Sequence, residues 1–122
     1  MSHKILLVED NPDILFNIKM MLEFNDFSVI EAKNGKEALK ILENIDYTPD
    51  LVLSDIMMPE MDGWVFYKTL KRDSKYAKVP FIFISARSDP NEVKRGLEIG
   101  AEDYIIKPFT EDKLIKKIQE KI

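Results

Sequence analysis

Five polar or charged residues that could do chemistry together follow short apolar runs in this sequence. Glu9 and Asp10 follow the first run, Asp55 the third, Ser85 the fourth and Lys107 the fifth. Three carboxylates that are brought close together repel one another, and a hard divalent cation bound through oxygen is the usual physical remedy. Mg²⁺ suits this set because it needs only one or two carboxylates and keeps several of its water ligands.

Lys107 and Ser85 would add a mobile positive charge and a hydroxyl donor to such a metal site. Phosphoryl is the group that fits best, because its transfer depends on positioning and on neutralising charge at the equatorial oxygens. Asp55 would then be the nucleophile and would form an acyl phosphate. Taken singly, each residue has an ordinary structural explanation as a helix cap, a surface ion pair or part of a solvated loop. The hypothesis therefore depends on all of them following strands of one sheet.

The apolar runs before these residues predict the strands that position them. The runs begin at Ile5, Phe27, Leu51, Phe81 and Tyr104. Their spacing of roughly 22 to 30 residues fits a strand, a helix and two loops. Continuous rather than alternating apolar residues are typical of parallel strands that are covered on both faces. We predict one α/β domain over residues 1–122, a doubly wound parallel sheet of five strands with five helices, whose strand ends share one edge.

Helix-start signals lie between the predicted strands. In chain order they are Asn11-Pro12, Asn34-Gly35, Asp62-Gly63, Asp89-Pro90 and Thr110-Glu111. We expect the fourth helix to end near Gly100, and the last to bury Leu114, Ile115, Ile118 and Ile122. We also expect Trp64 and the methionines to pack in the core rather than to line a cofactor pocket.

Composition narrows the classes of function. The chain has no cysteine, which excludes disulfides, thiolate metal sites and a cysteine nucleophile and suits a reducing cytoplasm. The single histidine, His3, precedes the first strand, so we expect it to be exposed and do not expect a zinc or copper site. The apolar runs are too short for a membrane span or a signal peptide. We therefore expect a cytoplasmic protein. The net charge is −4 and there is no dense basic block, so we do not expect direct nucleic-acid contact.

Four motifs give the chain a resemblance to the receiver domain of two-component response regulators, over essentially all 122 residues. They are residues 7–12, 55–63, 84–86 and 103–109. Each motif is weak alone, but four in order at compatible spacing are specific. The resemblance implies a flavodoxin-like fold with strand order 2-1-3-4-5. It implies a phosphorelay switch, in which Asp55 accepts a phosphoryl group from a sensor histidine kinase or a phosphotransfer protein.

The resemblance also implies a set of magnesium ligands. Asp10, Asp55 and the backbone carbonyl of Met57 would bind Mg²⁺, and Glu9 would hold a metal-bound water. Met57 and Arg87 occupy variable positions beside the site and would influence the lifetime of the phosphate. The domain would catalyse only its own phosphorylation and a slow self-catalysed dephosphorylation.

The phosphoryl group has its own set of contacts by resemblance. Lys107, Ser85 and the backbone amide of Ala86 would contact it, and a cis bond before Pro108 would hold the lysine in position. Ser85 and Tyr104 would move on phosphorylation and reshape the surface of the fourth helix, fifth strand and fifth helix. A downstream effector protein would bind there, and a dimer linked to phosphorylation is left open.

Three other interpretations compete with this one. A haloacid dehalogenase-type phosphatase places its nucleophile after the first strand with a second aspartate two residues on, where this chain has Met57. A flavodoxin-like FMN carrier needs a hydroxyl-rich or glycine-rich loop after the first strand, and residues 11–13 do not provide one. The main alternative is an unphosphorylated flavodoxin-like protein-interaction module, against which the joint presence of the chemical residues argues. A stand-alone regulator and the receiver part of a longer protein both remain open.

Overall fold

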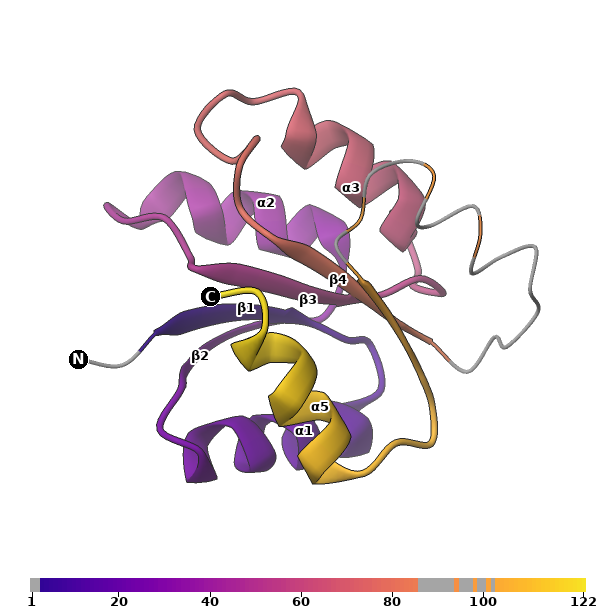
Figure 1. The fold of residues 1–122 in the computed structure, drawn as a ribbon. Helices are drawn as coiled ribbons and strands as arrows, with labels where there is room; N and C mark the ends of the chain where they lie inside the picture. Colours follow the sequence, from indigo (N-terminus) through magenta and orange to yellow (C-terminus); the bar gives the residue numbers. More distant parts are fainter. Residues whose placement is uncertain (1–2, 86–93, 95–97, 99–100, 102) are drawn as a thin grey trace.

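A five-stranded parallel sheet with helices on both faces forms the structure, a computed structural model that describes residues 3–85, 94, 98, 101 and 103–122 (Figure 1). In chain order the elements are β1 (Lys4–Val8), α1 (Pro12–Phe24), β2 (Ser28–Ala32), α2 (Gly35–Asn44), β3 (Leu51–Asp55), α3 (Gly63–Lys71), β4 (Phe81–Ser85), β5 (Asp103–Ile106) and α5 (Glu111–Gln119). The strand order is β2-β1-β3-β4-β5 and all neighbouring strands are parallel. The predicted doubly wound sheet is therefore confirmed. None of the helices in the described ranges is long and apolar enough to cross a membrane.

Apart from Lys94 and Glu98, which are helical, the predicted fourth helix lies outside the described residues. Its expected start at Asp89-Pro90 and its expected end near Gly100 both fall there. The same holds for Ala86 and Arg87, which directly follow β4. A helix between β4 and β5 thus remains a prediction from the sequence.

The helices that the structure describes cover the two faces of the sheet as two separate pairs. Successive residues of a strand point to opposite faces, and β1 shows this clearly. Leu6 and Val8 pack in the cluster that includes α2 and α3, whereas Ile5 and Leu7 pack in the cluster with α1 and α5. Figure 1 shows the two helix pairs on opposite sides of the sheet. This arrangement explains why the strand sequences are continuously apolar.

Short polar side chains begin the described helices, as the sequence predicts. The N-caps are Asn11, Asn34, Asp62 and Thr110. Asp62, for example, accepts a hydrogen bond from the backbone N–H of Val65 at 2.9 Å. Such caps satisfy N–H groups that have no partner within the first turn of a helix. They also fix the point at which each loop at the carboxyl edge of the sheet becomes helical.

Two element ends differ from the sequence prediction. The second strand begins at Ser28, one residue later than predicted, because the N–H of Phe27 donates to the carbonyl oxygen of Leu22 at 3.0 Å and belongs to the turn after α1. Ile122 was predicted to be buried but is 39% exposed, because α5 ends at Gln119. The side chain of Phe27 is nevertheless buried.

The prediction that the methionines pack in the core is wrong at two positions. Met20 and Met57 are 52% and 56% exposed, since Met20 lies on the outer side of α1 and Met57 on the loop after β3. Trp64 is buried as predicted and packs on Phe83, with 4.7 Å between the ring centroids. His3 is exposed, also as predicted.

Lys71 organises the connection between α3 and β4. Its Nζ donates to the carbonyl oxygens of Tyr76, Ala77 and Val79, all in that connection. It also lies 5.9 Å from the centroid of the Tyr67 ring. An ammonium group has three donors and no acceptor, so three carbonyls can satisfy it.

We predict that Lys71→Met destabilises the protein by about 1–3 kcal/mol, because three carbonyls lose a charged donor while the apolar stem of the side chain is kept. The measurement is the free energy of unfolding in urea. Lys68→Met is the matched control, since Lys68 is an exposed lysine of the same helix. Its effect should stay within about 0.5 kcal/mol. Equal losses in the two variants would contradict this role of Lys71.

Candidate functional site

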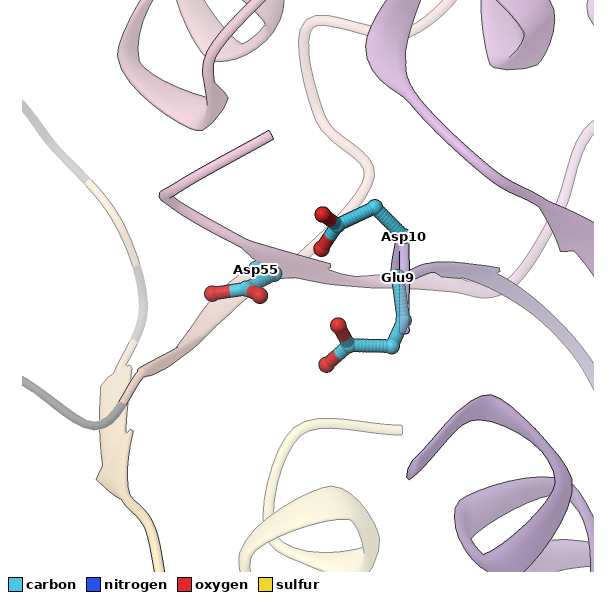
Figure 2. A group of neighbouring side chains, drawn as sticks. All are labelled: Glu9, Asp10 and Asp55. Carbon is cyan, nitrogen blue, oxygen red and sulfur yellow. The ribbon is translucent and has the colours of Figure 1, made fainter. Parts of the chain in front are cut away.

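Three carboxylates meet at the carboxyl ends of β1 and β3. Glu9 and Asp10 directly follow β1, and Asp55 is the last residue of β3. Val8 pairs with Ser54 in the parallel register, so the residues that follow them emerge side by side. One oxygen of each carboxylate lies within 4.8 Å of the others. Figure 2 shows Glu9 and Asp10 extending from the end of β1 toward the side on which Asp55 lies.

Lys107 compensates for the two carboxylates of this group that are buried. Glu9 is 1% exposed and Asp55 is 6% exposed, whereas Asp10 is open to solvent. The Nζ of Lys107 lies 2.6 Å from Oε1 of Glu9 and 3.4 Å from Oδ2 of Asp55. Buried carboxylates without a partner would be very costly, so the lysine is part of what makes this arrangement stable. Lys107 lies in the site as the sequence predicts, but its pairing with Glu9 was not predicted.

Burial makes Glu9 an unusually weak acid. It raises the pKa of Glu9 from 4.5 to about 7. The hydrogen bond from Lys107 opposes this rise, and the negative charge of Asp55 adds to it. The N–H of Asn11 donates to the other carboxylate oxygen, Oε2, at 3.2 Å and also favours the charged form. Glu9 therefore exchanges its proton close to neutral pH.

We predict that the stability of the metal-free protein falls as the pH rises from about 4.5 to about 7. The folded state binds the Glu9 proton more tightly than the unfolded state does, so this contribution is fully present below 4.5 and is lost as the pH rises through about 7. The measurement is the free energy of urea unfolding with a chelator present, at about pH 5 and about pH 8. Glu9→Gln cannot titrate and should lack this part of the pH dependence.

Glu43→Gln, at an exposed position on α2, is the control for that experiment and should keep the pH dependence of the parent. If Glu9→Gln and the parent lose stability equally between the two pH values, the raised pKa of Glu9 is wrong.

The carboxylate of Asp55 is oriented by the peptide group that joins Asp55 to Ile56. The N–H of Ile56 donates to Oδ1 at 2.7 Å, while Oδ2 lies 3.4 Å from the Nζ of Lys107. The hydroxyl of Ser54 donates to the backbone carbonyl oxygen of Asp55 at 2.9 Å. The two carboxylate oxygens thus have different partners, one a fixed amide and the other a flexible ammonium.

The loop after β3 borders the carboxylates. It is closed by a hydrogen bond of 2.8 Å from the N–H of Gly63 to the carbonyl oxygen of Ile56. Glu60 has a φ of 67°, a conformation that is uncommon for a residue other than glycine. Met57, whose carbonyl the resemblance makes a metal ligand, lies at the start of this loop, two residues after Asp55.

Ser85 and Lys107 are joined through their backbones at the same edge of the sheet. Asp55 pairs with Ile84 in the β3–β4 register, so Ser85 follows directly beside the end of β3. Ser85 is 1% exposed, and its carbonyl oxygen accepts from the N–H of Lys107 at 2.7 Å. The peptide bond between Lys107 and Pro108 is cis.

Tyr104 and Ala86 complete the set of predicted residues. Tyr104, on β5, is buried, and its ring centroid lies 6.4 Å from that of Phe83. Ala86 lies outside the described residues. The structure thus brings Glu9, Asp10, Asp55 and Lys107 together and places Ser85 at the same edge.

One surface feature was missed by the sequence analysis, although its signal was present. Phe16, Met20 and Phe24 are 61%, 52% and 80% exposed. They recur every four residues along α1, which places them on one side of the helix. An open pocket is lined by other residues of α1, including Met21, and by residues 107–109. Apolar surface therefore extends from α1 to Lys107.

The model of the response regulator receiver domain family matches residues 5–119. This match covers nearly all of the chain and agrees with the sheet order and the carboxylate group described above. The chain therefore belongs to the response regulator receiver domain family.

Curated relatives point in the same direction. The phosphate regulon transcriptional regulatory protein PhoB of Escherichia coli is 39% identical over 119 residues, which cover 98% of this chain and 51% of the relative. The probable transcriptional regulator ycf27 of Cyanidium caldarium is 37% identical over 118 residues, with 97% and 45% covered. The chain spans about half the length of these relatives.

Solved structures of similar proteins match over the whole chain. The chemotaxis response regulator CheY4 of Vibrio cholerae has a TM-score of 0.91 and 28% identity, with 100% of both chains covered. The receiver domain of a sensor histidine kinase from Pseudomonas aeruginosa has a TM-score of 0.89 and 28% identity, with 99% and 98% covered. That structure is described with a magnesium ion coordinated in its active site cleft.

The residues at this edge fit a hard divalent cation. All three side-chain donors are carboxylates, and they outnumber the one lysine that pairs with them in the described part of the chain. Asp10 is exposed, which leaves the group open to solvent on one side and suits an ion that keeps water ligands. The chemistry of the donor set therefore agrees with Mg²⁺.

Proposed function

We propose that this chain is a phosphorelay signalling switch in which Asp55 accepts a phosphoryl group in a Mg²⁺-dependent reaction. The donor would be a sensor histidine kinase or a phosphotransfer protein. The observation that carries the proposal is the meeting of three carboxylates and Lys107 at one edge of a receiver-type sheet. The whole protein's target and pathway are separate from this assignment, since the curated relatives are about twice as long.

Mg²⁺ would be held by Asp10, Asp55 and the backbone carbonyl of Met57, with Glu9 acting through a metal-bound water. When bound, the ion supplies neutralisation of the charge on the phosphoryl oxygens. The chain's own contribution is to fix the carboxylate of Asp55. The N–H of Ile56 holds Oδ1 at 2.7 Å, which limits the rotation of the carboxylate.

In the transfer step, a carboxylate oxygen of Asp55 forms a bond to phosphorus while the bond between phosphorus and the donor's histidine nitrogen breaks. The product is an acyl phosphate on Asp55. Lys107 is already 3.4 Å from Oδ2 of Asp55 and would leave Glu9 to pair with the incoming phosphoryl oxygens. The hydroxyl of Ser85 and the backbone amide of Ala86 would donate to the same group.

Phosphorylation would shift a conformational equilibrium rather than create a new fold. Ser85 and Tyr104 would change position, because contacts to the phosphoryl oxygens favour one of two arrangements. The surface made by the predicted fourth helix, β5 and α5 would then bind a downstream effector protein. The domain would act on its own Asp55 only, through phosphorylation and slow dephosphorylation.

We predict that acetyl phosphate and Mg²⁺ add one phosphoryl group to the parent protein and none to Asp55→Ala, because the variant lacks the nucleophile. Intact-protein mass spectrometry measures the addition, and a beryllofluoride mimic should perturb the NMR spectrum of the parent but not that of Asp55→Ala. Asp46→Ala removes an exposed aspartate elsewhere and should behave as the parent. If the parent and Asp55→Ala behave alike, the assignment is wrong and the protein-interaction module is favoured.

The apolar side of α1 is where we place the phosphodonor protein. A donor histidine has to reach Asp55, so its protein must cover a surface next to the site. Phe16, Met20 and Phe24 are exposed apolar residues on α1, and a pocket lined by other residues of the same helix reaches Lys107. Aromatic side chains in such positions often dominate the energetics of protein interfaces.

We predict that Phe16→Ser combined with Phe24→Ser slows phosphotransfer from a phosphorylated histidine kinase by at least about tenfold, through loss of apolar contact with the donor. The kinase is chosen from a panel of phosphorylated histidine kinases as the one that transfers its phosphoryl group to the parent protein fastest. Phosphorylation by acetyl phosphate should be unchanged, because that donor needs no docking surface. Val65→Ser removes an exposed apolar residue of α3 and is the control. Equal slowing with both donors would contradict a docking role.

A further inference from the structure

We infer that Gly63 is a positioning residue for the phosphoacceptor. Because glycine has no side chain, the start of α3 can pack directly against the Asp55–Ile56 peptide, which orients the carboxylate of Asp55. This inference rests on the proposed role of Asp55. Gly63 would act only through packing, because it has no side chain that could contact a metal ion or a phosphoryl group.

The space around Gly63 leaves no room for a side chain. A Cβ built on Gly63 would lie 2.4 Å from the backbone carbonyl oxygen of Asp55, 2.8 Å from the Cα of Ile56 and 3.2 Å from the carbonyl carbon of Asp55. Real Cβ atoms essentially never come within 3.0 Å of a heavy atom that is distant along the chain. All three contacted atoms belong to the backbone, so no side-chain rotation can relieve the clash. Any larger residue must therefore displace the Asp55–Ile56 peptide or the start of α3.

The displaced peptide is the one that holds the nucleophile. Its carbonyl belongs to Asp55 and its N–H belongs to Ile56, and that N–H donates to Oδ1 of Asp55 at 2.7 Å. Because a peptide group is planar, moving its carbonyl also tilts its N–H. The N–H of Gly63 in turn donates to the carbonyl oxygen of Ile56 at 2.8 Å. Gly63 thus touches the orienting peptide by packing and is linked by a hydrogen bond to the peptide that follows it.

Gly35 provides a matched comparison. It is also a buried glycine that begins a helix, and a Cβ there would lie 2.9 Å from Cβ of Phe66 and 3.0 Å from Sδ of Met61. These atoms belong to side chains rather than to the peptide of Asp55. Alanine at Gly35 therefore crowds the packing between α2 and α3 without pushing on the nucleophile.

The test compares Gly63→Ala with Gly35→Ala for stability in urea, for Mg²⁺ affinity by calorimetry and for the rate of phosphorylation by acetyl phosphate at saturating Mg²⁺. We expect both variants to be less stable than the parent. Only Gly63→Ala should be phosphorylated at least about tenfold more slowly, because a small misplacement of a reacting group has a large effect on rate. A rate within about twofold of the parent, or an equal loss in Gly35→Ala, would overturn the inference.

The two proposals fail in different ways in this experiment. If the parent itself is not phosphorylated, the proposed function of Asp55 is wrong. If the parent and Gly35→Ala are phosphorylated and Gly63→Ala matches them, only the role of Gly63 is wrong.

Ser54→Ala keeps the inference testable if Gly63→Ala does not fold. The hydroxyl of Ser54 donates to the same carbonyl of Asp55 at 2.9 Å, so its loss loosens the same peptide without crowding it. We expect phosphorylation to be slowed about threefold, with a shift in the amide proton resonance of Ile56 that reports a changed hydrogen bond to Oδ1. An unchanged rate with an unchanged resonance would overturn the inference.

Discussion

Burial of neighbouring carboxylates at one edge of the sheet is the constraint on which this site depends. Glu9 and Asp55 are almost fully buried, and Asp10 stands beside them. Desolvation of these charges opposes folding, and Lys107 offsets only part of that cost. The part of the desolvation cost that Lys107 does not offset raises the pKa of Glu9 to about 7. A bound cation would offset both the cost of burying these carboxylates and the repulsion between them.

The sheet keeps the charged residues from moving apart. Apolar layers on both faces fix β1 and β3 in register, so the carboxylates emerge from rigid strands rather than from free loops. The loops that follow β1 and β3 end at the N-caps of α1 and α3, which are Asn11 and Asp62. Close packing of Gly63 on the Asp55–Ile56 peptide extends the same rigidity to Asp55. The site therefore combines a fixed frame with one long side chain, Lys107, whose Nζ contacts both buried carboxylates.

The sequence predicted the sheet well because its signal is local and strong. Continuous apolar runs indicate buried parallel strands, and the geometry of parallel strands then brings Asp10, Asp55 and Lys107 to one edge. Pairing of Lys107 with Glu9 could not be predicted, since it depends on where a loop places a long side chain. The exposure of Phe16 was missed because α1 carries apolar residues on both sides, and periodicity does not tell which side the sheet covers. The late start of β2 depends on Asp26, whose φ of 68° reverses the chain after α1.

The central claim, that one magnesium site is formed by residues from β1 and β3, is tested most directly by calorimetric titration of Mg²⁺ into three proteins: the parent, Asp10→Asn and Asp13→Asn. Asp13 is an exposed aspartate in the first turn of α1, so its variant loses the same charge close by. We predict saturable binding at one site in the parent, an affinity at least about tenfold weaker in Asp10→Asn and an affinity within about twofold of the parent in Asp13→Asn. Equal weakening in both variants, or no saturable binding in the parent, would contradict it.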